Sequence, residues 1–224
     1  MRWRGAIAAA LLLAACQQPA NAAEEKIVLA PAPALAAHES GGLKTAIFSG
    51  GCFWGVEAVF SHTKGVTSAI SGYQGGSKAT AHYEIVSSGT TGHAESVKVT
   101  YDPKVVRYDQ LLRIFFSVIA DPTTLDYQGP DHGTQYRSAL VPLNDEQRKV
   151  AKAYLAQMAK SGVWKSPIVT RIEPYKGFYP AENYHQDFMK KNPTQGYIVY
   201  WDEPKVLALQ KLFPKLYSPT FKTG

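Results

Sequence analysis

The chain has 224 residues, of which 45% are hydrophobic, with 24 lysines and arginines against 18 acidic residues. This length and composition indicate one domain with a substantial buried core. The formal charge of +6 is mild and scattered along the chain, which excludes a protein built to bind nucleic acid.

The N-terminus has the pattern of a secretory leader. A short basic segment, residues 1–4, precedes an apolar run over residues 6–15 that is too short to span a bilayer as a permanent helix. The run ends in Leu13-Ala14-Ala15-Cys16, which resembles the bacterial lipobox, whose cysteine becomes the lipid-modified first residue of the mature protein. We expect residues 1–15 to be a lipoprotein signal peptide, although an ordinary secretory leader followed by a chance cysteine is the alternative.

The next segment, residues 16–42, is rich in Ala, Pro, Gln and Glu and has neither strand nor helix periodicity. We expect a lipidated Cys16 followed by a flexible tether, and a folded domain over residues 43–224. The protein would then be lipid-anchored in the bacterial cell envelope and face the periplasm. Loss of the leader removes two arginines and no acid, which lowers the formal charge from +6 to +4.

Cys52 is the only cysteine of the expected domain and follows a glycine pair. The β-branched and apolar residues 45–48 predict a short buried strand, and residues 56–60 are spaced like the start of an amphipathic helix. A strand-to-helix turn would place the thiol at free backbone N–H groups and the positive end of the helix dipole, which favour a reactive thiolate. The alternative is a cysteine buried for packing.

The clearest strand covers residues 95–101, after a modest strand at 66–73 and a loop over 74–84. Alternation along the strand places Glu95 on the apolar face that carries Val97 and Val99. A carboxyl group on that face is desolvated, so its pKa should rise and keep it protonated near neutrality. The alternative is that Glu95 lies at the strand end and reaches solvent.

The second half of the chain predicts further elements. A helix over 108–119 is followed by a polar loop over 121–137, which is either a site or a plain surface connection. Asn144 with Gln147 predicts a capped helix that ends at Gly162. Then come a strand over 168–172, an aromatic segment over 178–188, and residues 192–224 without a dominant pattern.

Three segments resemble the signature segments of peptide methionine sulfoxide reductase A, in the same order, and the similarity covers roughly residues 44–192. They are Gly51-Cys52-Phe53-Trp54-Gly55, Thr91-Gly92-His93-Ala94-Glu95 and Asp131-His132-Gly133-Thr134-Gln135-Tyr136-Arg137-Ser138, with further similarity at Gly72-Tyr73 and Tyr184-His185-Gln186. This resemblance implies an α+β fold with a ferredoxin-like two-layer core, long loops and a shallow, solvent-facing site.

The resemblance also implies roles for the site residues. Cys52 would attack the sulfur of methionine S-sulfoxide, free or in proteins, and become a sulfenic acid as methionine is released. Glu95 would donate a proton or hydrogen bond to the sulfoxide oxygen, and Tyr83 and Tyr136 would assist there. An apolar wall formed by Phe53 and Trp54 would receive the methyl group of the substrate. The Asp131 carboxylate would support the polar side of the pocket.

A thiol must then reset the enzyme, for which we expect no bound cofactor and no metal. Many family members use further C-terminal cysteines for a disulfide that thioredoxin reduces, but residues 189–224 contain no cysteine. We therefore expect a one-cysteine cycle that depends on a thioredoxin-like protein or a small thiol. The expected partners are oxidised proteins or peptides, this reductant and the membrane, for a monomeric protein.

Other interpretations remain open at this stage. Three histidines, at positions 93, 132 and 185, together with Cys52 and Asp131 could suggest a metal site, but no close ligand pair such as C-x-x-C is present. The same residues could form the Cys-His-Asp relay of a cysteine hydrolase. The aromatic content also allows a lipoprotein binding module whose thiol is incidental.

Overall fold

The structure is a computed structural model that describes residues 27–224. The expected signal peptide and Cys16 lie outside the described residues, as does the first part of the expected tether.

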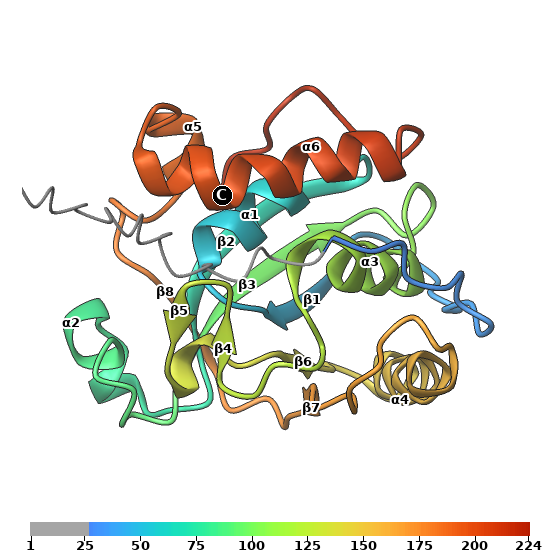
Figure 1. The fold of residues 1–224 in the computed structure, drawn as a ribbon, viewed down its shortest axis with the longest axis horizontal. Coiled ribbons are helices and arrows are strands. Elements are labelled where there is room, and N and C mark those ends of the chain that lie inside the picture. The colour runs from blue at the N-terminus through green and yellow to red at the C-terminus, as the bar shows by residue number, and fades with distance from the viewer. Residues whose placement is uncertain (1–26) are drawn as a thin grey trace, which may run out of the picture.

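A mixed sheet forms the centre of the molecule (Figure 1). Its middle strands are antiparallel, in the order β6-β1-β3-β2, and the flanking strands are β7, parallel to β6, and β8, antiparallel to β2. The strands are β1 (Lys44–Ser49), β2 (Val66–Gln74), β3 (Ala94–Tyr101), β6 (Ala139–Val141), β7 (Arg171–Ile172) and β8 (Phe178–Pro180). A separate two-stranded hairpin consists of β4 (Tyr127–Gln128) and β5 (Asp131–His132).

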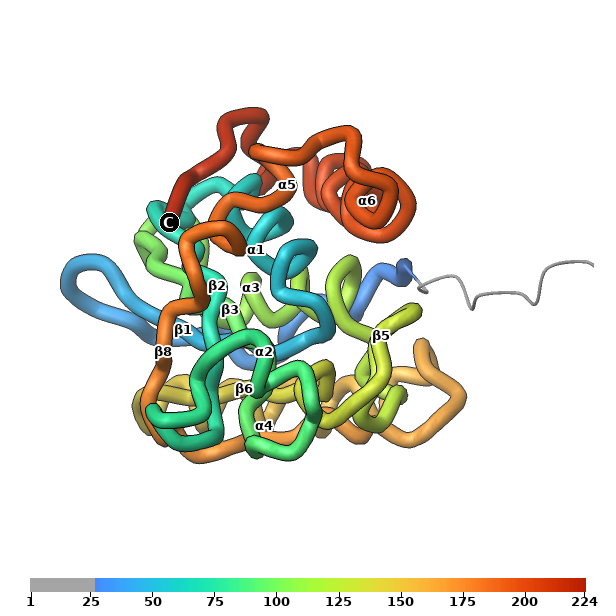
Figure 2. The backbone as a smooth tube through the Cα atoms, turned by 90° about the vertical axis from the view of Figure 1, so that its left-hand side faces the viewer, coloured from blue at the N-terminus to red at the C-terminus, as the bar shows by residue number. Residues whose placement is uncertain are grey.

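Helices connect and cover these strands. The longer ones are α1 (Phe53–Ser61), α3 (Tyr108–Ile114), α4 (Asp145–Lys160) and α6 (Glu203–Leu212), and the short ones are α2 (Tyr83–Val86) and α5 (Phe188–Lys191). Helix α1 packs against β2 and β3, and α6 packs against α1. In both views α5 and α6 lie at the top over α1, whereas α4 lies at the opposite end, near β6 (Figures 1 and 2).

The buried residues of β3 alternate with partly exposed ones from Val97 onward, as expected for a strand with one buried face. Val97, Val99 and Tyr101 are fully buried, whereas Lys98 and Thr100 between them are partly exposed. The core beside this strand is aromatic, since the ring of Phe48 lies 4.8 Å from that of Phe60 and 5.3 Å from that of Phe115. The strong alternation and the large buried rings leave only one register for the strand.

Most predicted elements are confirmed, including the capped helix α4. The Asn144 side chain accepts a hydrogen bond from the Gln147 N–H at 2.8 Å, and Gly162 beyond the last turn has φ +72°. Helix α6 and the π-helical turn before it, Ile198–Asp202, were not predicted. The buried face of α6 includes Lys205 as well as Val206 and Leu209, so its apolar period is interrupted.

The segment over residues 27–42 differs from the flexible tether that we expected. Ala30 and Ala37 are almost fully buried, and their N–H groups donate to Ser117 Oγ at 3.0 Å and Asp109 Oδ1 at 2.9 Å. The Glu39 carboxylate accepts hydrogen bonds from the hydroxyl of Tyr101 and the N–H of Tyr108. Residues 27–42 are therefore docked on the rest of the domain through backbone hydrogen bonds and small buried side chains, although the segment has neither helix nor strand periodicity. We call this segment the strap. Within residues 27–224, no helix is long and apolar enough to cross a bilayer.

This docking predicts a loss of stability when the strap is removed. A chain that starts at residue 43 should unfold with a free energy on the order of 2–4 kcal/mol lower than one that starts at residue 27, because it exposes apolar surface and leaves Glu39-bound donors unpaired. Urea unfolding followed by circular dichroism would measure the difference. Equal midpoints for the two chains would contradict the docked position.

Candidate active site

Cys52 lies in the turn between β1 and α1, as the sequence predicts. Gly51 has φ +92°, and a Cβ atom there would come within 2.7 Å of the Gln128 side chain. Because L residues rarely adopt this φ, glycine is required to turn the chain into the helix. Cys52 itself is the last residue before the helix, with φ −55° and ψ 123°.

The thiol is more buried than a reactive cysteine at a solvent-facing turn should be. Cys52 is only 9% exposed. Burial raises the pKa of the thiol well above its ordinary value, and the nearby acids Glu95, Asp202 and Asp131 add to the increase, while the Trp54 backbone N–H acts in the opposite direction. The expectation of a thiolate at rest is therefore wrong. Burial and the acidic neighbours outweigh the effect of the helix N-terminus, so Cys52 is a thiol at rest.

Glu95 lies at the start of β3 and is 2% exposed, which removes the alternative of a solvated strand end. Its Oε2 accepts a hydrogen bond from the Phe53 N–H at 3.0 Å, so the carboxyl group lies against the first turn of α1. Burial raises the pKa of Glu95 to about 8, with Asp131 and Asp202 adding to the increase and the Phe53 N–H opposing it. The group is thus mostly protonated at neutral pH, in agreement with the sequence-based expectation.

Two tyrosines lie near this pair, each from a different loop. Tyr83 is the first residue of α2, and Tyr136 ends the 3₁₀ turn Thr134–Tyr136. Burial raises the pKa of both phenols, and Glu95 and Cys52 are among the groups that add to the increase. Both side chains therefore stay protonated and can donate hydrogen bonds near the thiol.

The two aromatic residues after Cys52 are placed differently. Phe53 is 1% exposed, and its ring lies 5.0 Å from that of His185. Trp54 is partly exposed and stacks on Phe188, with centroids 3.7 Å apart, while its Nε1 donates to His185 Nδ1 at 3.1 Å. The two rings of the expected apolar wall are thus a partly exposed indole and a buried phenyl ring, and both lie near the His185 ring.

Asp131 lies in β5 and accepts a hydrogen bond from the hydroxyl of Tyr197. Burial raises the pKa of this carboxyl, while Tyr197 and the charge of Lys205 oppose the increase. The neighbouring Asp202 and Lys205 are buried and 3.5 Å apart. A Cβ atom on Gly55 would come within 2.2 Å of Asp202 Oδ1, so this glycine allows α6 to approach α1.

The sequence did not predict that Tyr197, Asp202 and Lys205 belong to the site, because residues 192–224 have no clear helix or strand period. Only two signals pointed toward it: the motif glycine at position 55 and the similarity at Tyr184-His185-Gln186.

The histidines do not converge as the metal and hydrolase interpretations would require. His93 Nδ1 accepts a hydrogen bond from the Gly76 N–H at 3.2 Å, and His185 Nδ1 accepts the one from Trp54. Within residues 27–224, no group of three or more His, Cys, Asp or Glu side chains could hold a metal ion.

Comparison with known proteins agrees with this arrangement. Residues 44–216 match the family model described as peptide methionine sulfoxide reductase. The chain is 59% identical over 177 residues to peptide methionine sulfoxide reductase MsrA 2 of Mesorhizobium japonicum, which covers 79% of this chain and 91% of the relative. It is 46% identical over 181 residues to the Synechocystis protein of the same name, covering 81% and 83%.

Solved structures give the same result. The reduced form of Mxr1 from Saccharomyces cerevisiae superimposes with a TM-score of 0.62 and 37% identity, over 73% of this chain and 93% of that one. Methionine sulfoxide reductase A of Corynebacterium diphtheriae gives a TM-score of 0.58 and 31% identity, over 79% and 86%. The family model spans more than half of the chain, and the relatives cover it with high identity. The chain is therefore an oxidoreductase that reduces methionine sulfoxide, and it belongs to the peptide methionine sulfoxide reductase family.

Proposed function

We propose that the enzyme acts on methionine S-sulfoxide, free or in proteins, with Cys52 as the nucleophile and Glu95 as the proton donor. The observation that carries this proposal is the hydrogen bond that holds the Glu95 carboxyl against the first amide of the Cys52 helix. This hydrogen bond fixes the position of the carboxyl group near the thiol, and burial raises its pKa to about 8 and so keeps it mostly protonated at neutral pH. Preference for the S epimer rests on family membership alone.

The proposed step balances as a thiol plus a sulfoxide giving a sulfenic acid plus a thioether. Glu95 passes its proton to the sulfoxide oxygen, and the resulting carboxylate takes the proton from the Cys52 thiol. The thiolate thus forms only as it attacks the sulfur, which is consistent with the raised pKa of the resting thiol. Attack forms a bond between the Cys52 sulfur and the substrate sulfur. This bond and the substrate S–O bond then break as the protonated oxygen moves to the Cys52 sulfur, which releases methionine and leaves the sulfenic acid. Glu95 holds the proton that it took from the thiol, so it ends the step protonated.

The surrounding side chains would bind the substrate. Tyr83 and Tyr136 stay protonated and would donate hydrogen bonds to the oxygen as negative charge develops there. The methyl group would lie against the apolar rings of Phe53 and Trp54, of which Trp54 is the more exposed. Asp131, held by Tyr197, would support the polar side of the pocket.

An external thiol would reset the enzyme, because Cys52 is the only cysteine among the described residues. A thiolate of a thioredoxin-like protein or a small thiol would attack the sulfenic sulfur and release water, leaving a mixed disulfide. A second thiol would then release the Cys52 thiol. This proposal assigns no resolving function to Cys16, which would be acylated at its sulfur.

The core is proposed to be ferredoxin-like. The order β6-β1-β3-β2 is antiparallel throughout, with α1 between β1 and β2 and α3 between β3 and β6, and this supports the split β-α-β arrangement. Helix α4, the strands β7 and β8 and the C-terminal helices are additions to that core.

We also propose that the protein is a monomeric lipoprotein that faces the periplasm. The support is the leader that ends at Cys16. Ten residues lie between Cys16 and Ile27, the first described residue of the strap, and extended chain reaches at most about 3.5 Å per residue. Ile27 would therefore lie within about 40 Å of the anchored cysteine.

Cys52 can be tested in a single turnover without reductant, on a peptide that contains methionine S-sulfoxide. We expect at most about one methionine per enzyme and a gain of one oxygen at Cys52, measured by mass spectrometry. Cys52→Ser should release no methionine. Trapping of a disulfide between Cys52 and Cys16 after one turnover would overturn the one-cysteine cycle.

The role of Glu95 predicts a pH dependence. Because the protonated carboxyl is the active form and its pKa is about 8, the single-turnover rate should fall as the pH rises through that value. Glu95→Gln should lower the rate by about 10²-fold and abolish this decline, because an amide cannot give up a proton. Rapid-quench measurements from about pH 6 to 10, which bracket the pKa of Glu95, would follow both. An unchanged rate in Glu95→Gln would reject the role of donor.

The lipid anchor can be tested in a bacterial host by fractionation and labelling with a fatty-acid analogue. The full chain should be labelled and found in the membrane fraction, and Cys16→Ser should be unlabelled and lost from it. Cys52→Ser is the matched control and should stay anchored. A full chain that is secreted without lipid would indicate the ordinary leader instead.

A further inference from the structure

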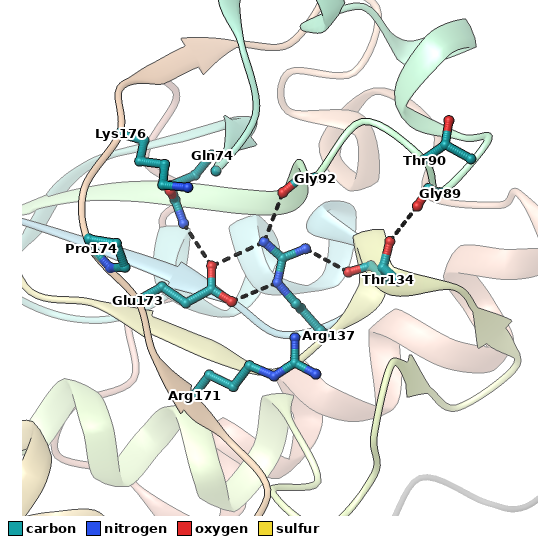
Figure 3. A pocket seen from close by; sticks show the side chains of 11 residues that line it. Gln74, Gly89, Thr90, Gly92, Thr134, Arg137, Arg171, Glu173, Pro174 and Lys176 are labelled. Carbon is teal, nitrogen blue, oxygen red and sulfur yellow. Dashed lines mark hydrogen bonds and ion pairs between the residues drawn. The ribbon is translucent and has the colours of Figure 1, made fainter.

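We propose that Arg137 is a positioning residue that sets the relative places of Glu95 and Tyr136. The inference rests on the proposed function, since it assigns a task to a residue that supports the proton donor. Arg137 lies directly after Tyr136 in the chain and is 7% exposed. Its guanidinium group lies between the loop that leads into β3 and the turn that carries Tyr136 (Figure 3).

Arg137 bonds the backbone of both segments. Nη1 donates to the carbonyl oxygens of His93 at 3.1 Å and Thr134 at 2.8 Å, and Nη2 donates to that of Gly92 at 3.0 Å. His93 is two residues before Glu95, and Thr134 is two residues before Tyr136. One planar group therefore fixes the distance between the two chain segments that bring the acid and the phenol to Cys52.

The guanidinium is itself held by Glu173. Nε donates to Oε1 at 2.7 Å and Nη2 donates to Oε2 at 3.0 Å, which is the bidentate geometry that arginine favours. Burial alone would raise the pKa of Glu173, but the hydrogen bonds and charge of Arg137 lower it, so the carboxylate stays ionised. The Glu173 N–H donates to the Leu140 carbonyl at 2.9 Å, which ties this anchor to the central sheet.

These contacts use all the donors of Arg137. An arginine carries five N–H groups. One is on Nε and bonds Glu173, two on Nη1 bond His93 and Thr134, and two on Nη2 bond Gly92 and Glu173. The side chain has no donor left for a substrate, so any effect on catalysis passes through Glu95 and Tyr136. Lysine could not replace it, because one ammonium cannot match this planar set of acceptors.

A cavity of about 480 Å³ borders the guanidinium and makes the proposal testable by chemical rescue. Thr90, Arg171 and Lys176 line its outer part, and Arg137 with Glu173 lines the inner part (Figure 3). A small planar cation could therefore enter the space that a truncated side chain leaves. The Thr134 hydroxyl also donates to the Gly89 carbonyl at 2.6 Å, and the Gln135 side-chain amide donates to the Ser87 carbonyl at 3.3 Å, so the two loops stay in contact without Arg137.

The experiment compares the full chain with Arg137→Ala and Arg137→Lys by single-turnover kinetics. Both variants should reduce the sulfoxide about 10²-fold more slowly, with a small change in KM, because a misplaced donor affects the chemical step more than binding. The pH at which the rate declines should also move, because the packing that sets the pKa of Glu95 has changed. Guanidinium, well below denaturing concentrations, should raise the rate of Arg137→Ala in a saturable manner, and methylammonium should not.

Arg171→Ala is the matched control. Arg171 lines the same cavity and pairs with Asp126 at 3.5 Å, and within residues 27–224 its side chain has no hydrogen bond to either loop. It should keep the wild-type rate. Equal losses in both alanine variants, equal rescue by methylammonium, or a wild-type rate in Arg137→Lys would each overturn the proposal. Arg137→Lys keeps the buried positive charge, so it carries the test if Arg137→Ala does not fold. Failure of the proposed function would instead show as normal turnover by Cys52→Ser.

Discussion

The site depends on one hydrogen bond, from the Phe53 N–H to the Glu95 carboxyl. It joins the start of β3 to the first turn of α1, and it lies directly beside Cys52 in the chain. The amide that donates this bond is one of the free N–H groups that every helix N-terminus presents. If this end of α1 served only to stabilise a thiolate, the Phe53 N–H would donate to the Cys52 sulfur. Here the Glu95 carboxyl accepts it, so the helix terminus would serve both groups of the proposed mechanism, the proton donor and the nucleophile.

The surroundings of Cys52 act against a resting thiolate. Burial raises the pKa of the thiol most, and Glu95, Asp202 and Asp131 add to the increase when they are ionised. A permanently ionised thiol would react with any oxidant that reached it, since the thiolate is the susceptible form. In the proposed mechanism the thiol loses its proton only when the substrate oxygen takes one from Glu95, so the nucleophile would form only in the presence of a sulfoxide.

Segments that are distant in sequence hold these groups in place. The C-terminal part supplies Tyr197 to Asp131, Phe188 and His185 to Trp54, and the Asp202–Lys205 pair beneath Gly55. Arg137 and Glu173 tie the loop before β3 to the turn of Tyr136 from the other side. At the far end of the sheet, Glu39 of the strap over residues 27–42 accepts hydrogen bonds from the Tyr101 hydroxyl and the Tyr108 backbone N–H. The reacting pair itself is small, and most of the chain serves to fix it.

The sequence by itself determined the elements whose local pattern is strong. The alternation around Val97 predicted both β3 and the burial of Glu95, and Gly51 before Cys52 predicted the strand-to-helix turn, because only glycine adopts its φ without strain. Only the tertiary structure decided the features that do not follow from helix or strand periodicity in the sequence. The protonation of Cys52 depends on acids that converge from three parts of the chain. Helix α6, with a lysine on its buried face, and the strap, with no period at all, are stabilised by contacts with partners far away in sequence.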